Sequence, residues 1–247
     1  MPSATDIQRT ARRAGVLYLV LSIVAMFSFY YLRPRFVITG DAAATASNIL
    51  ADERLYRTGL LLDLFAQLVF IAVVLELYRL FRDVDRTQAR LMLALVGTGI
   101  AVQVASQALN VAPLILLGGA NYLAAFTRPQ LEALAYGSLT LFGKQGDLLT
   151  AFWGVWLFPF AYLTIKSGFL PKFLGVLLVL SGVAYVVTCA TAIVFPAAVA
   201  TVTKFMMPLY FGELIVVLWL AFVGARPRAA SVHLRPHDAP EEQDRPR

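Results

Sequence analysis

Three acidic residues stand beside long apolar stretches of this sequence, and their type and placement suggest the chemistry that the chain can support. They are Asp63, Asp147 and Glu213, and Glu213 lies within the segment FGELIVV. An ionisable side chain is costly in hydrocarbon, so such residues normally face water or the interior of a helix bundle. A carboxylate placed there can bind a cation or accept a proton, and its protonation depends strongly on desolvation. Glu213 and Asp63 are therefore the first candidates for a functional site.

Amide side chains accompany the acids at helical spacing. Gln103, Gln107 and Asn110 are separated by four and three residues, which places them on one face of a helix, and Gln67 follows Asp63 by four residues. With the helix directions given below, these amides and the three acids all fall in the outer half of the membrane. We therefore predict one polar cavity that opens outward and is closed toward the cytoplasm. Its expected lining residues are Arg57, Asp63, Gln67, Gln103, Gln107, Asn110, Lys144, Asp147 and Glu213.

A simpler interpretation gives each acid a local basic partner near the start of its own helix. The pairs would be Arg57 with Asp63, Lys144 with Asp147, and Lys204 with Glu213. Charges one or two turns below the membrane boundary can also extend toward water. The sequence leaves both the shared cavity and the three local pairs open.

Several familiar chemistries are missing from the sequence. Cys189 is the only cysteine, which excludes an internal disulfide and every cysteine-based metal motif. The two histidines, His233 and His237, both stand in the C-terminal tail, so no imidazole is expected within the membrane for haem, zinc or proton transfer. There is no G-x-S-x-G elbow, no Walker-type phosphate loop and no H-E-x-x-H motif. We expect no cofactor and no metal site.

The composition is that of a membrane protein. Of the 247 residues 59% are hydrophobic and only 15% are charged, against roughly one quarter in an average soluble domain. Each crossing needs about 20 apolar residues, and the apolar runs predict an all-α bundle of six transmembrane helices within residues 1–224, followed by a disordered cytoplasmic tail at 225–247. The predicted spans are 14–32, 57–79, 89–112, 145–165, 172–194 and 206–224.

The net charge is +6, but the basic residues are scattered between these apolar runs and form no single stripe. This distribution disfavours a nucleic-acid partner, and the lipid bilayer is the expected partner.

The distribution of basic residues predicts the orientation. With the N-terminus inside, the inner segments hold 14 of the 21 lysines and arginines, so we expect both termini in the cytoplasm. In the loop 40–57, Asp41 is a plausible N-cap, and the alanine-rich stretch after it predicts a short amphipathic helix on the outer surface; a solvated linker is the alternative. Residues 113–137 are too apolar for an open loop and are expected to lie along the membrane interface.

Small residues and prolines predict details of the packing. Gly97, Ala101 and Ala105 recur every four residues on the third span, and Gly175 and Gly182 share a face of the fifth, so we expect close helix contacts at both places. Pro159 is expected to kink the fourth span.

Four segments together resemble a bacterial membrane family called domain of unknown function 4386. They are Arg13-Ala14-Gly15, GDAAATASNILADERLYRTG (40–59), LPKFLGVLLVLSGVAY (170–185) and GELIVVLWLAFVG (212–224). The resemblance covers about residues 8 to 224 and implies a six-helix protein of the bacterial cytoplasmic membrane. It supplies no catalytic residue. It implies that Gly212 and Glu213 belong to the family pattern, whereas Asp147 has no clear counterpart there.

Three functions are compatible with these features. The first is binding or transport of a small polar or cationic solute, with Glu213 and Asp63 as charged ligands and proton acceptors. The second is an accessory or sensor protein in which the charges only hold helices together. The third is a lipid-modifying enzyme, which the missing histidines and nucleophile motifs disfavour. The sequence gives neither the solute nor a reaction.

Overall fold

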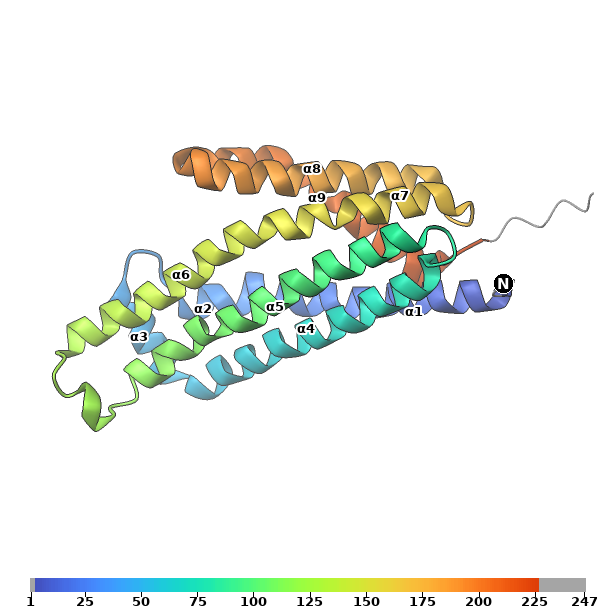
Figure 1. Cartoon of the computed structure of the whole chain (residues 1–247). Helices are drawn as coiled ribbons and strands as arrows, with labels where there is room; N and C mark the ends of the chain where they lie inside the picture. Colours follow the sequence, from blue (N-terminus) through green and yellow to red (C-terminus); the bar gives the residue numbers. More distant parts are fainter. Residues whose placement is uncertain (1–2, 227–247) are drawn as a thin grey trace, which may run out of the picture.

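The computed structural model describes residues 3–226, and within that part of the chain it is entirely helical, with no strand. Six helical stretches are long and apolar enough to cross a membrane, which confirms the predicted six-span bundle (Figure 1). The spans are Ala4–Phe36, Glu53–Phe81, Arg86–Leu116, Arg128–Ser167, Lys172–Val194 and Pro196–Val223. The protein is therefore a multi-pass membrane protein.

Several spans are built from more than one helical segment. The elements are α1 (Ala4–Phe27), the π-helical turn η1 (Ser28–Leu32), α2 (Arg33–Phe36), α3 (Ala42–Ala51), α4 (Glu53–Phe81), α5 (Arg86–Leu116), the 3₁₀ turn η2 (Asn121–Leu123), α6 (Arg128–Val155), α7 (Leu157–Ser167), α8 (Lys172–Val194), the 3₁₀ turn η3 (Pro196–Ala198), α9 (Val199–Leu218) and the π-helical turn η4 (Trp219–Val223). The predicted disordered tail lies almost wholly outside the described residues.

The first and last described residues lie at the same end of the bundle, which we call the terminal end (Figure 1). There the Arg226 amide donates to the Phe169 carbonyl, and the Gln8 side chain donates to the Val223 carbonyl. The opposite end, which carries α3 and η2, is called the distal end. An even number of spans returns the chain to the side from which it started.

The helices begin earlier than the apolar runs predict. Capping side chains set the starts of α4 and α6: Asp52 accepts from the Leu55 amide, and Thr127 forms a capping box with Gln130. The span predicted at 145–165 therefore begins at Arg128, and most of the segment 113–137 belongs to α5 and α6 instead of lying along the interface. An apolar run reports the part of a helix in contact with lipid, whereas the cap determines where the helix starts.

The predicted surface helix and kink are both present. Asp41 caps α3 by accepting from the Ala44 amide at 2.8 Å. The break between α6 and α7 falls at Trp156, three residues before Pro159. Proline lacks the amide that would bond to the carbonyl of Val155, which explains a break at this point.

The six spans form a closed ring in the order of the sequence. Each span packs against the next, and the last returns to the first: α1 with α4, α4 with α5, α5 with α6 and α7, these two with α8, α8 with α9, and η4 with α1. Glycines permit four of these approaches, because an added Cβ would lie within 3.0 Å of the backbone of the neighbouring helix at Gly15, at Gly154 and the facing Gly182, at Gly175 and at Gly212. The predicted contacts at Gly175 and Gly182 are thus confirmed. The one predicted at Gly97 is wrong, since nothing lies within 4 Å of a Cβ added there and Ala101 and Ala105 are exposed.

The interior of the terminal half is filled by aromatic side chains. Trp156 and Phe160 stack at 5.4 Å between ring centroids, and Phe70 and Phe81 meet them edge-on at 5.8 Å each. All four are nearly or fully buried. We call this set, together with Tyr18 and Trp153, the aromatic layer.

The loop between α4 and α5 is fixed at the terminal end by Asp85. Its carboxylate accepts from the Thr87 and Gln88 amides and pairs with Lys166 at 3.2 Å. The Gln88 amide and the lysine hold the pKa of Asp85 below its usual range. The contact ties the start of α5 to the end of α7.

Candidate functional site

Asp63 lies on α4, ten residues after the start of the helix, and its side chain is half-buried. Its carboxyl lies beside the Ser28 hydroxyl and the Gln107 amide, and the Arg33 guanidinium acts on it electrostatically over a longer distance. These groups come from η1, α5 and α2. The contacts place Asp63 on the inner side of the bundle, in its distal half.

The π-helical turn η1 directs Ser28 and Arg33 toward this carboxyl. The Arg33 amide donates to the Ser28 carbonyl, five residues earlier, where an α-helix would bond four residues apart. Five residues of α-helix would separate the two side chains by about 140° around the axis, whereas the wider turn brings them onto one side. Single π-helical turns of this kind are frequent at functional sites.

Two amides of α5 extend the polar surface. The Asn110 side chain donates to Gln107 Oε1 at 2.9 Å, and the Tyr56 hydroxyl donates to the Asn110 carbonyl at 2.7 Å. Gln107 is only 6% exposed and Asn110 9%. The predicted amide stripe therefore faces inward at these two positions, and Gln103 lies one helical turn before Gln107 on the same face.

Several buried polar atoms near Asp63 have no hydrogen-bond partner among the described residues. They are Ser28 Oγ, Gln67 Oε1, Gln107 Nε2 and both side-chain polar atoms of Gln145. Gly99 of α5 packs against Trp153 of α6, and the two helices run antiparallel. Gln107 follows Gly99 by eight residues, and Gln145 precedes Trp153 by eight residues. The two glutamines therefore lie at the same level, toward the distal end. A buried polar group without a partner is costly, so a solute that supplied partners for these atoms would be bound favourably there.

We call this set of residues the polar cluster. Its members are Ser28, Arg33, Asp63, Gln67, Gln107, Asn110 and Gln145. Eight residues of α-helix separate Gln107 from Gly99, so the polar cluster lies about 12 Å from the contact of Gly99 with Trp153, toward the distal end.

Glu213 occupies a different place. Its carboxylate accepts hydrogen bonds from the Tyr18 hydroxyl of α1 and, at 3.1 Å, from the Tyr185 hydroxyl of α8. Tyr18 also packs against Phe70 and Trp156, so Glu213 lies at the level of the aromatic layer. Ten residues along α1 separate Tyr18 from Ser28, a distance of roughly 15 Å.

Asp147 and Lys144 form an exposed ion pair on α6, with Nζ and Oδ2 3.3 Å apart. Their side chains are 40% and 68% exposed. This confirms one of the three local pairs. The helix runs unbroken through residues 143–147, which carry this pair.

The other two predicted pairs are wrong. Arg57 pairs with Glu53 at 2.7 Å, one helical turn earlier, because six residues of helix place Asp63 on another face. Lys204 makes no ion pair within residues 3–226, and Glu213, nine residues later, lies about half a turn away around the helix.

Within the same range, no hydrogen bond or ion pair joins any two of Asp63, Asp147 and Glu213, and no three His, Cys, Asp or Glu side chains form a potential metal site.

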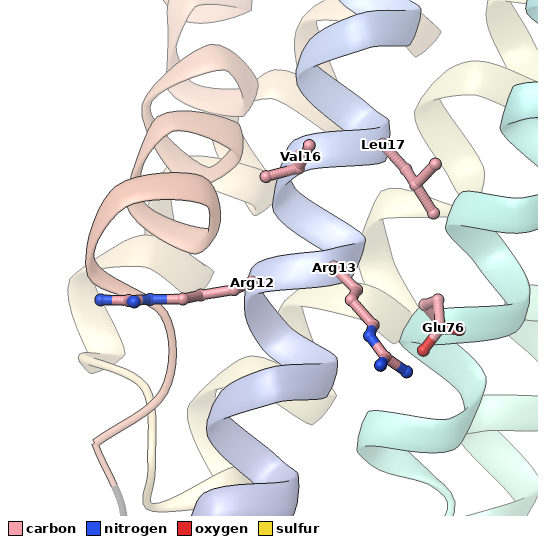
Figure 2. A pocket seen from close by; sticks show the side chains of 5 residues that line it. All are labelled: Arg12, Arg13, Val16, Leu17 and Glu76. Carbon is pink, nitrogen blue, oxygen red and sulfur yellow. The ribbon is translucent and has the colours of Figure 1, made fainter.

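A hollow of about 400 Å³ lies elsewhere, on the terminal half between α1 and α4 (Figure 2). It is lined by Arg12, Arg13, Val16, Leu17 and Glu76. Figure 2 shows Arg13 and Glu76 pointing toward one another while Arg12 points away, and Glu76 pairs with Arg79 at 2.7 Å. Its surface is mainly apolar, and none of the predicted cavity residues lines it.

The residues that sequence reasoning missed follow from packing. Nothing in the local sequence marks Ser28 and Arg33, because a π-helical turn has no simple sequence signature. Tyr18 and Tyr185 become partners of Glu213 only through the contacts of α1 and α8 with α9. Gln145 stands beside Lys144 and Asp147, and its register opposite Gln107 could have been found by pairing the third and fourth spans.

Comparison with known proteins gives one match. A family model described as Domain of unknown function (DUF4386) matches residues 13–224, which include the polar cluster and Glu213. No curated protein and no solved structure matches the chain.

Proposed function

Since the chain belongs to the family described as Domain of unknown function (DUF4386), a description that carries no activity, we propose from its own geometry that it binds and transports a small polar or cationic solute. The binding site is the polar cluster, and Asp63 is its charged ligand. Glu213 serves as a second carboxylate and proton acceptor deeper in the bundle. Asp147 and Lys144 lie at the entrance on α6.

The observation that carries this proposal is the set of unpartnered polar atoms around Asp63. Hydrocarbon cannot satisfy Gln67 Oε1 or the Gln145 amide, and no described side chain does so, while Ser28 Oγ and Gln107 Nε2 have only the Asp63 carboxyl beside them. A small solute with several hydrogen-bonding groups would satisfy them together. Polar residues of this kind inside a membrane bundle commonly mark substrate pathways.

The aromatic layer supports a site with access from one side. Trp156, Phe160 and Phe81 fill the interior toward the terminal end, and η4 closes against α1 there, where Gly15 meets Leu220 and Ala221. The polar cluster lies on the distal side of this barrier. With the terminal end in the cytoplasm, as the distribution of basic residues predicts, the site opens to the outside of a bacterial cytoplasmic membrane.

Replacing Asp63 by asparagine tests the proposal. We expect methylammonium or β-alanine to raise the unfolding temperature of the purified wild-type protein, because a ligand that binds the folded state stabilises it. The Asp63→Asn variant should bind the effective probe about 10- to 100-fold more weakly, as expected for loss of a charge-assisted hydrogen bond. The measurement is thermal unfolding in detergent at increasing probe concentration.

Asp83→Asn is the matched control, since Asp83 is exposed in the loop between α4 and α5 at the terminal end. It should respond to the probe like the wild type. Equal responses of Asp63→Asn and the wild type would remove Asp63 from the site, and a wild type that responds to neither probe would contradict the proposal itself.

A second candidate is an accessory or sensor protein whose charges are structural. The ion pair of Lys144 with Asp147 and the two hydroxyls that hold Glu213 favour it, because both acids then have protein partners. Neutralising Asp63, Asp147 and Glu213 together would leave such a protein folded and still able to co-purify with a stoichiometric partner.

A further inference from the structure

Arg33 bears on the chemical class of the solute. It is the one basic member of the polar cluster, and its guanidinium lies against α6: a Cβ added at Gly143 would be 2.6 Å from Arg33 Nη2. The guanidinium also lies over the Phe142 ring, 5.8 Å from its centroid. The glycine and the aromatic face thus hold the guanidinium between α2 and α6, within electrostatic range of Asp63.

Arg33 and Asp63 are close enough to interact but do not form an ion pair. No side-chain nitrogen of Arg33 lies within 4.0 Å of a carboxylate oxygen of Asp63. Arg35, two residues later, does pair with an acid, Asp52, at 3.5 Å. Two opposite charges therefore belong to the same polar cluster without pairing with each other.

A simple cation would fit this arrangement poorly. Bound at Asp63, it would also meet the positive charge of Arg33, and like charges repel strongly where water is scarce. A simple anion at Arg33 would meet the carboxylate in the same way. A solute that carries both charges would satisfy each of them, and its remaining polar groups could bond to the Gln107 and Gln145 amides.

We propose that the polar cluster binds a small zwitterion, with its ammonium group at Asp63 and its carboxylate at Arg33. This inference rests on the proposed function and specifies its substrate class. The carboxylate would take charge-assisted hydrogen bonds from the planar guanidinium, a geometry for which arginine is well suited. A separation above 4.0 Å between the protein charges favours a solute whose own charges stand a few bonds apart, as in β-alanine or γ-aminobutyrate.

The test compares probes that differ only in their charges. β-Alanine carries both charges, methylammonium only the positive one and propionate only the negative one. We expect the wild type to bind β-alanine about tenfold or more tightly than either of the other two, the affinity equivalent of one additional charge-assisted hydrogen bond. Arg33→Gln should lose this preference, binding β-alanine and methylammonium alike.

Gly143→Ala supplies a variant that keeps every charge. Its methyl group would displace the guanidinium, and since the contacted atom is the end of a flexible side chain, the fold should be retained. We expect β-alanine to bind about tenfold more weakly while methylammonium binding stays within twofold, roughly the error of such measurements. Gly146→Ala is the matched control on the same helix, because nothing lies within 4 Å of a Cβ added there.

The outcomes separate the two proposals. If the wild type binds methylammonium as tightly as β-alanine, and Asp63→Asn weakens the binding of both, the inference of a zwitterionic solute is wrong and the proposed function stands. If Gly143→Ala binds β-alanine like Gly146→Ala, Arg33 does not hold the carboxylate and the inference fails. If none of the probes stabilises the wild type, both proposals fail.

Discussion

Replacing Gly15 by alanine is expected to destabilise the protein by about 3 kcal/mol or more, at the upper end of the cost of overpacking. A Cβ at this position would lie 2.2 Å from the Ala221 nitrogen and 2.3 Å from the Leu220 carbonyl carbon. Both atoms belong to the backbone of η4 and cannot move aside like the end of a side chain. The added methyl group must therefore separate α1 from η4, where the terminal end of the bundle is closed.

The measurement is the free energy of unfolding in detergent, with Gly97→Ala as the control. Nothing lies within 4 Å of a Cβ added at Gly97, and alanine is the better helix former by up to about 1 kcal/mol. The control should be as stable as the wild type or slightly more stable. If Gly15→Ala unfolded like the control, α1 and η4 would not be in the contact described here.

Replacing Glu213 by alanine is expected to cost a similar amount, about 3 kcal/mol or more. The Tyr18 and Tyr185 hydroxyls would both lose their acceptor, and a cavity would remain beside the aromatic layer. Each buried hydroxyl left unpaired costs about 1 to 3 kcal/mol. Tyr18→Phe should cost about 1 kcal/mol, because it removes one hydrogen bond and leaves Glu213 its second donor.

Glu213→Gln separates the structural role of this residue from its proposed function. The amide retains one acceptor for a tyrosine hydroxyl, so the loss of stability should be smaller than for alanine. The proposed proton acceptor would nevertheless be gone, and we expect solute binding or its pH dependence to be lost. A binding curve and pH profile equal to those of the wild type would contradict the proposed role of Glu213 as a proton acceptor. A fully stable Glu213→Ala would show that its hydrogen bonds do not stabilise the fold.

The sequence was sufficient to predict the six spans, because an apolar run of span length has few alternatives to a membrane helix. It also predicted the cap at Asp41 and the break near Pro159, which depend on single residues with strong local effects. The helix starts at Glu53 and Arg128 were missed, since both lie outside the apolar runs. The small residues at Gly97 and Gly182 are equivalent in sequence, and only tertiary contact shows that one is exposed and the other packed.

The candidate site was partly predictable for the same reasons. The spacing of Gln107 and Asn110 identified an inward polar face, and their hydrogen bond confirms that they act together. The sequence could not show that Asp63 lies near Arg33, because that contact depends on the π-helical turn η1. Nor could it show that Glu213 is held by Tyr18, which is 195 residues away in the chain.

Thiol labelling at Gln107 tests the central claim, a polar cluster reached by water from the distal side. In a Cys189→Ser background, Gln107→Cys should react with the membrane-impermeant cationic reagent MTSET added outside intact cells. Val96→Cys, fully buried on the same helix in the terminal half, should not react. If the thiol at position 107 proved no more reactive than the thiol at position 96, the polar cluster would be closed to water and the proposed solute site would be contradicted.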